Sequence, residues 1–220
     1  MCRIAFREGW DEHLAGHITW RQPDGNLLTN PWELTWDEIT ASDVVTVDPE
    51  GNILDSDWNI TPAIGLHLQL HKARHEVGVV MHNHPRWSGI WASAGKVPPV
   101  YDQAGAYVPG ELPLFNEYDG TFEDRDLTAG VVEALGDASW ALLAHHGALV
   151  LGKDLRQAHL RMATLEWRSK RAWEIAQLGD AKPLPQAIVD QVGLPDANGF
   201  PFLFEAMARR ELRNDQGVLD

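Results

Sequence analysis

Short apolar runs separated by polar, turn-forming residues characterise the first quarter of the chain. Residues 17–20, 27–29 and 44–47 are rich in β-branched, aromatic and other apolar side chains, a composition that predicts three strands. The third run is followed by a turn sequence at 48–52 and by an apolar pair at 53–54, as expected for a return strand. We therefore expect the chain to begin with antiparallel strands joined by hairpins.

Helical spacing of apolar residues dominates the rest of the chain. Thr61 and Pro62 provide an N-cap and a proline suited to the first helical position, which predicts a helix that runs to Ala73. Apolar residues three or four positions apart predict two further helices, from about 121 to 135 and from 155 to 178. The other elements that we expect are buried strands at 77–81 and 141–144 and short C-terminal helices at 185–192 and about 201–213.

Length and composition favour one compact domain followed by a short extension. The chain has 220 residues, of which 44% are hydrophobic, enough to form one sizeable core. Residues 1–182 are expected to form an α/β domain, and residues 183–220 a helical extension. Because the extension carries Phe200, Phe202 and Phe204, we expect it to contact another subunit.

The chain is acidic, with 32 Asp and Glu against 18 Lys and Arg and a formal net charge of −14. It has no cluster of basic residues, so nucleic acids and anionic membranes are not expected partners. The N-terminal sequence is charged, and no apolar run approaches the roughly 18 residues of a membrane span, so a cytoplasmic protein is expected. The single cysteine, Cys2, cannot form an internal disulfide, and no histidine lies near it in the sequence to activate it as a nucleophile.

The ten histidines are unevenly distributed along the chain. His82 and His84 follow a β-rich apolar run, and side chains two residues apart in a strand point to the same side of the sheet. They are either two ligands of a metal ion or a solvated pair at the end of a strand. A catalytic metal site usually needs a third protein ligand, which His145 or His146 can supply at the end of another apolar strand. The spacing does not decide between these two, and Gly147 after them suits a tight turn.

A second set of histidines, His67, His71 and His75, is spaced by four residues around the helix expected after Thr61. Side chains at this spacing share one helix face and can also bind a metal ion. They alternate with leucines and basic residues, as on an ordinary, partly exposed face, and no glutamate follows His67 as in the zinc-protease motif. We therefore favour the ordinary helix face.

The order of motifs along the chain resembles that of the class II aldolase/adducin family over about residues 9–178. The similar segments are Gly16-His17-Ile18-Thr19, Asn30-Pro31, the turn at 48–52, Leu66-His67, Ala73-Arg74, the strand that ends in His82-Asn83-His84 and the strand that leads to His146-Gly147. This resemblance implies a three-layer α/β/α fold with a central mixed, largely antiparallel sheet. It also implies a homo-oligomer, typically a cyclic tetramer with active sites between neighbouring subunits.

Residue by residue, the resemblance places His82, His84 and His146 at the family's metal ligands. His145 falls at a position where the family usually has asparagine. The resemblance thereby implies one divalent metal ion per chain. Zn2+ is the expected ion, and Mn2+, Fe2+ and Co2+ are alternatives.

The chain departs from the sugar-phosphate aldolases of this family at three places. Ala63 stands where they have a catalytic glutamate, and Thr61-Pro62 stands where they have two serines. The segment Gly16-His17-Ile18-Thr19 replaces their phosphate-binding Gly-Asn-x-Ser loop, and their N-terminal helix is largely missing before Gly9. A phosphate-binding nest is therefore not expected. The sequence is closer to an adducin-like bacterial branch that keeps the metal histidines.

These features predict a metal-dependent carbon–carbon lyase, either a decarboxylase or an atypical aldolase. It is expected to act on a small hydroxy- or keto-acid or carbonyl substrate through a metal-stabilised enolate. The candidate catalytic residues are His17 and Tyr118, and for Tyr118 a packing role is the alternative. The candidate substrate-binding residues are Arg86, Asn30 and Thr61. Arg86 either pairs with a substrate carboxylate or is simply solvated.

Two tryptophans and two other classes of function complete the expectations. Trp87 and Trp91 follow the strand that ends in His82-Asn83-His84. We interpret them as core residues, and the alternative is that they line a pocket for an aromatic substrate. An Fe(II)-dependent oxygenase is possible at the same histidines, and the identity of the metal distinguishes it from a lyase. A non-catalytic, adducin-like binding protein is the other alternative, and it requires an empty site.

Overall fold

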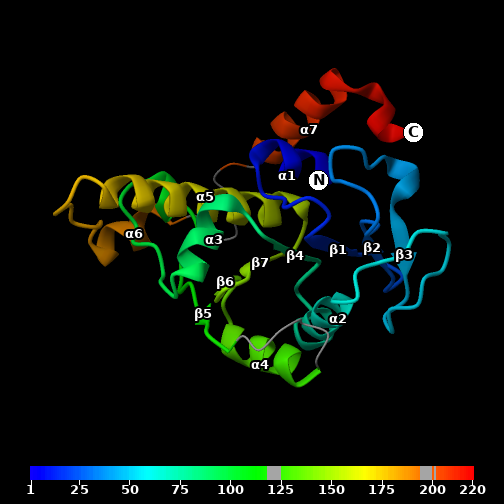
Figure 1. Cartoon of the computed structure of the whole chain (residues 1–220), viewed down its shortest axis with the longest axis horizontal. Coiled ribbons are helices and arrows are strands. Elements are labelled where there is room, and N and C mark those ends of the chain that lie inside the picture. The colour runs from blue at the N-terminus through cyan, green and yellow to red at the C-terminus, as the bar shows by residue number, and fades with distance from the viewer. Residues whose placement is uncertain (118–124, 194–199, 201) are drawn as a thin grey trace.

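A seven-stranded sheet lies at the centre of the chain, between layers of helices (Figure 1). The computed structural model describes residues 1–117, 125–193, 200 and 202–220. The strands run in the order β3-β2-β1-β4-β7-β6-β5, and neighbours are antiparallel except for β5 and β6, so the expected mixed, largely antiparallel sheet is confirmed. The strand bounds are β1 (His17–Arg21), β2 (Leu27–Thr29), β3 (Val45–Val47), β4 (Val79–Asn83), β5 (Leu114–Phe115), β6 (Trp140–Leu143) and β7 (Gly147–Gly152).

Helices cover both faces of this sheet, which confirms the expected three-layer α/β/α fold (Figure 1). Their bounds are α1 (Cys2–Glu8), α2 (Ile64–Ala73), α3 (Arg86–Ser93), α4 (Arg125–Leu135), α5 (Leu155–Ala176), α6 (Gln186–Val192) and α7 (Leu203–Asn214). The helices α3 and α5 pack on one face, and α2 and α4 pack on the other. Over these ranges, no helix combines the length and the apolar character that crossing a membrane requires.

The strand β4 shows how the sheet sorts side chains between its two faces. All five residues from Val79 to Asn83 are buried, because β1 and β7 flank the strand on both edges and helices cover it on both faces. Val79 and Met81 join the hydrophobic cluster beneath α3 and α5, whereas Val80 joins the cluster beneath α2 and α4. Since side chains alternate along a strand, His82 shares the face of Val80 and lies toward α2.

Some elements differ from those expected. The helix expected from Thr61 begins at Ile64, because the Thr61 hydroxyl accepts a hydrogen bond from the Ala63 backbone at 3.2 Å and a turn forms first. The return strand expected at 53–54 is reduced to a single bridge to β3. The sequence pattern does not predict α1, α3, the two-residue β5 or β7. A helix of seven residues, α1, does precede Gly9, where the sequence suggests that the N-terminal helix is largely missing. The start near 121 that we expect for the helix corresponding to α4 lies outside the described residues.

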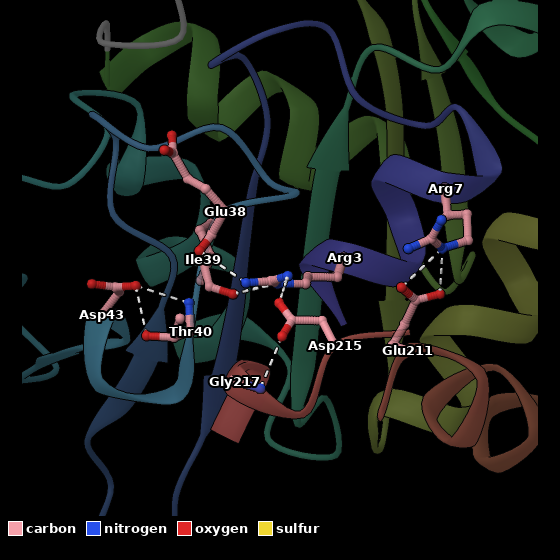
Figure 2. A network of polar contacts seen from close by, with 9 residues as sticks. All are labelled: Arg3, Arg7, Glu38, Ile39, Thr40, Asp43, Glu211, Asp215 and Gly217. Atoms are coloured by element: carbon pink, nitrogen blue, oxygen red, sulfur yellow. Dashed lines mark hydrogen bonds and ion pairs between the residues drawn. The ribbon is translucent and has the colours of Figure 1, made fainter. Parts of the chain in front are cut away.

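Ion pairs connect the C-terminal helix α7 and its flanking turn to the N-terminal helix α1 (Figure 2). Arg3 contacts Asp215 at 2.7 Å, and Arg7 contacts Glu211 at 2.7 Å. Glu211 is nearly buried between the two helices, so its carboxylate needs this guanidinium partner. The helix α7 therefore packs within its own chain, against α1 and α5. That the extension also contacts another subunit stays a prediction.

Candidate metal centre

Three imidazoles converge at the end of β4. Among the residues that the structure describes, His82, His84 and His146 form the one group of potential metal ligands whose donor atoms all lie within 4.8 Å of one another. The Nε2 atoms of His82 and His146 are 3.1 Å apart. The three ring centroids are separated by 4.7 to 5.2 Å. The structure thus brings together the three histidines that the family resemblance implies as ligands.

The strands fix these positions. His82 lies inside β4 and His84 follows its end, so both project toward the same face of the sheet. The third histidine comes from the turn between β6 and β7, where the His146 backbone N–H donates to the Leu143 carbonyl at 3.1 Å. His145, the competing candidate, has a left-handed backbone with φ 58° and an exposed side chain. It is not part of the cluster in the described structure.

Gly147 makes this arrangement possible by close approach rather than by a tight turn. Its φ is not in the left-handed region, so the expected reason for a glycine is wrong. A Cβ at this position would lie 2.4 Å from the Asn83 carbonyl oxygen and 2.8 Å from Cδ2 of His84. Only a residue without a side chain lets β7 approach the end of β4 and the His84 ring so closely.

Hydrogen bonds on the far side of two rings orient their Nε2 atoms toward the cluster. His82 Nδ1–H donates to the Ala148 carbonyl at 2.9 Å, and His84 Nδ1–H donates to a carboxylate oxygen of Glu12 at 2.9 Å. A carboxylate or carbonyl partner of this kind fixes the tautomer of a metal-ligating histidine. Each neutral ring is then left with an unprotonated Nε2, the atom that binds metal.

Burial keeps the rings of His82 and His146 neutral. It lowers the pKa of His82 well below its usual value. Burial, together with the neighbouring His84, lowers the pKa of His146 to about 4. Nitrogen ligands of a tetrahedral zinc ion, at roughly 2.0–2.1 Å from the metal, lie about 3.3 Å from one another. The 3.1 Å separation of the His82 and His146 nitrogens and their imidazole chemistry therefore fit a divalent transition metal ion.

Glu12 is a site residue that the sequence does not reveal, because it belongs to no motif and lies far from His82, His84 and His146 in the chain. We expect Glu12→Gln to weaken zinc binding about tenfold, the lower end of the range for such supporting partners, since its side chain is largely exposed. Competition with a chromogenic chelator measures this affinity. The same change at the exposed Glu50 is the control, and equal affinities of the two variants would contradict a role for Glu12.

The candidate catalytic residues have different positions. His17 is buried on β1 directly opposite His82 of β4, and the two ring centroids are 4.9 Å apart. Tyr118 lies outside the described residues. Ala63, at the family's glutamate position, is the N-cap residue of α2, and its methyl group cannot transfer a proton. His17 is therefore the candidate that the structure places beside the cluster.

The candidate substrate-binding residues contact mainly the protein itself. Asn30 accepts a hydrogen bond from the Ile18 backbone at 2.9 Å and donates to the Gly16 carbonyl at 3.4 Å, so it braces the segment before His17. The Thr61 hydroxyl is bonded to the backbone, as described above. Arg86 is exposed at the start of α3 and lies over the Trp87 ring, 5.1 Å from its centroid. Binding of substrate by these three residues stays a prediction.

The backbone conformation and close contacts of residue 16 explain why a glycine occupies this position in the loop before His17. Its φ is +103°, a conformation that side chains rarely adopt. A Cβ here would lie 2.9 Å from Cζ2 of Trp36 and 3.3 Å from the His82 carbonyl oxygen. The loop is therefore held against β4, the strand that carries His82, and this contact aligns His17 with His82.

The second histidine set is not an ordinary exposed helix face, and that interpretation is wrong for two of its members. His67 is 0% exposed and His71 is 5% exposed, whereas His75 is exposed. The buried pair faces β1, where each ring is hydrogen-bonded to the Thr19 hydroxyl. These histidines therefore form a polar layer between α2 and the sheet, beside the metal centre.

Two curated proteins are similar in sequence to part of this chain. A 5-methylthioribulose-1-phosphate/5-deoxyribulose-1-phosphate aldolase of Rhodospirillum rubrum is 27% identical over 119 residues, which are 54% of this chain and 53% of that protein. A 4-hydroxy-3-prenylphenylpyruvate oxygenase/4-hydroxy-3-prenylbenzoate synthase of Streptomyces roseochromogenus subsp. oscitans is 25% identical over 132 residues, which are 60% of this chain and 47% of that protein. The chain thus spans about half the length of the curated relatives that it matches.

Solved structures and a family profile extend this similarity to most of the chain. An aldolase II superfamily protein from Pseudomonas syringae is 28% identical and superposes with a TM-score of 0.86, covering 100% of this chain and 92% of that one. The profile described as Class II Aldolase and Adducin N-terminal domain matches residues 1–173. With the fold, the histidine cluster and this match in agreement, the chain belongs to the class II aldolase and adducin family.

Proposed function

We propose that the chain is a divalent-metal-dependent carbon–carbon lyase that acts on a small hydroxy- or keto-acid or carbonyl substrate. The observation that carries this proposal is the convergence of the His82, His84 and His146 nitrogens within 4.8 Å, at the end of the central strand β4. Family membership and the aldolase name of the Rhodospirillum relative support it. We also propose that the ion is Zn2+, that the protein is a homotetramer and that it belongs to the adducin-like bacterial branch.

The chemistry divides between the metal and the side chains. When bound, a divalent ion supplies a Lewis acid that stabilises the negative charge developing on substrate oxygens as a carbon–carbon bond breaks. The side chains must hold the substrate and move one proton. We assign the proton to His17, which is buried beside His82. Tyr118 is a second candidate for the proton, and the exposed Arg86 is a candidate for binding a substrate carboxylate.

Aldol cleavage and decarboxylation place different demands on His17. In aldol cleavage, a base takes the proton of the substrate hydroxyl, that oxygen becomes a carbonyl oxygen, and the electron pair of the broken carbon–carbon bond leaves an enolate. In decarboxylation, CO2 leaves without an initial proton transfer, and an acid then protonates the carbanion. The first reaction needs His17 as an acceptor and the second needs it as a donor.

The Streptomyces relative favours a second candidate function, because its name includes an oxygenase activity. Three histidines also suit Fe(II). An Fe(II)-dependent oxygenase is therefore the alternative, and its substrate would be oxidised with consumption of O2. A lyase consumes no O2, which makes the two functions easy to separate.

Incubation of the zinc-loaded full chain with panels of sugar phosphates, 2-hydroxy- and 3-keto-acids, and hydroxybenzoic acids tests the proposal. We expect at least one compound to release an aldehyde or CO2, followed by coupled assays, and we expect no release from the His146→Ala variant. Release that survives complete removal of metal, or no release from any panel, would contradict the proposal. Consumption of O2 by the Fe(II)-loaded chain would replace it with the oxygenase.

A further inference from the structure

A series of buried polar groups leads from the metal centre into the layer between β1 and α2. His17 Nδ1 lies 2.7 Å from His67 Nε2, and His67 Nδ1 lies 2.8 Å from the Thr19 hydroxyl. The same hydroxyl lies 2.8 Å from His71 Nε2, and His71 Nδ1 lies 3.3 Å from the Val77 carbonyl oxygen. The four side chains are at most 6% exposed, so these groups satisfy one another rather than water.

The Val77 carbonyl determines the direction of every hydrogen bond in this series. A carbonyl oxygen only accepts, so the proton of a neutral His71 ring is on Nδ1, and its Nε2 accepts. The Thr19 hydroxyl has one proton, which it donates to His71 Nε2, and it therefore accepts from His67 Nδ1–H. His67 Nε2 is then unprotonated and accepts from His17 Nδ1–H. Each bond thus points away from the metal centre.

This assignment requires neutral rings, and the surroundings favour them. Burial lowers the pKa of His67 well below its usual value. Burial, and after it the charge of Arg21, lowers the pKa of His71 to about 4. At neutral pH neither ring carries a second proton. The opposite direction would need an imidazolium at His71, so it is disfavoured.

We infer that Thr19, His67 and His71 are positioning residues that hold His17 as the Nδ1–H tautomer, with Nε2 unprotonated. In an imidazole ring Nε2 lies on the opposite side from Nδ1, so it points away from the bond to His67. The tautomer follows from the hydrogen bonds between neutral rings and does not depend on the proposed function. The role of His17 rests on the proposed lyase function: a ring in this state is a proton acceptor, which is the demand of aldol cleavage rather than of decarboxylation.

Nuclear magnetic resonance of the zinc-loaded full chain labelled with 15N-histidine tests the inference. The His17 signals are those lost in a His17→Asn variant. We expect Nδ1 of His17 to resonate as a protonated nitrogen and Nε2 as an unprotonated one. In Thr19→Val, His67 Nδ1–H has no acceptor, so we expect His67 to donate from Nε2 and His17 to change to the Nε2–H tautomer. Thr19→Ser keeps the hydroxyl and should retain the original tautomer.

Thr29 provides a matched control. It pairs with Thr19 across β1 and β2, it is 2% exposed, and its hydroxyl has no hydrogen-bond partner in the described part of the chain. Thr29→Val should therefore leave the His17 signals unchanged. An Nε2–H tautomer of His17 in the unmodified chain, or an unchanged tautomer in a folded Thr19→Val variant, would overturn the inference. If no substrate panel gave a product, the proposed function would be refuted, but the tautomer of His17 could still be as inferred. Failure of the proposed function and failure of the inference are therefore distinguishable.

Discussion

His146→Ala is expected to abolish stoichiometric metal binding, whereas His145→Ala is expected to leave it intact. The structure places the His146 Nε2 atom 3.1 Å from that of His82, while His145 is exposed in the same turn. Structural zinc sites with four protein ligands bind with about 10–16 kcal/mol, so the loss of one ligand weakens binding roughly 100-fold or more. Elemental analysis after dialysis should find about one ion per chain in the unmodified protein and in His145→Ala.

The thermal stability of the same proteins provides an independent measurement. A ligand that binds only the folded state stabilises it by an amount that grows with the logarithm of its concentration relative to its Kd. Excess zinc should therefore raise the unfolding temperature of the unmodified chain and of His145→Ala, and a chelator should reverse the increase. His146→Ala should show a much smaller increase at the same zinc concentration. Full metal content in folded His146→Ala would exclude this residue as a ligand.

Gly147→Ala should damage both the fold and the metal centre. The added Cβ would lie 2.4 Å from the Asn83 carbonyl oxygen and 2.8 Å from the His84 ring, so β7 must separate from β4 or the ring must move. Overpacking of this kind costs about 1–3 kcal/mol, and displacement of His84 weakens metal binding as well. Denaturant unfolding and zinc titration measure the two effects.

Gly89→Ala is the matched control. Gly89 lies within α3, close in sequence to His84, and a Cβ there would meet no atom within 4 Å. Alanine favours a helix over glycine by about 0.5–1 kcal/mol, so this variant should be slightly more stable and bind zinc normally. If Gly147→Ala behaved in the same way, close approach of β7 to β4 would not be the reason for the glycine.

The sequence predicts those parts of the site that depend on local periodicity. His82 and His84 are two residues apart at the end of an apolar run, and this alternation alone places them on one side of a strand. The long helix from Leu155 to Ala176 likewise follows from the spacing of its apolar residues, and in the structure the Asp154 side chain caps its start. The choice of His146 over His145 needs the family resemblance, because either residue can end the strand.

The rest depends on contacts between residues that are distant in the sequence. Glu12 reaches His84 across 72 positions, and no local pattern marks it. His67 and His71 alternate with leucines and basic residues as on a partly exposed helix face, yet they are buried because β1 carries the Thr19 hydroxyl opposite them. A buried histidine on this helix needs such a hydrogen-bond partner, and the helix sequence does not show it.

The central position of β4 also constrains how the metal centre can open. The strand is hydrogen-bonded to β1 on one edge and to β7 on the other, so its amides can exchange with solvent only when the sheet itself separates. The outer helix α7, which packs on α1 and α5, can detach without disturbing those strands. Slow hydrogen–deuterium exchange at the ligand-bearing strand should therefore accompany faster exchange at the end of the chain. Release of a bound ion through distortion of this strand would be as rare as global unfolding.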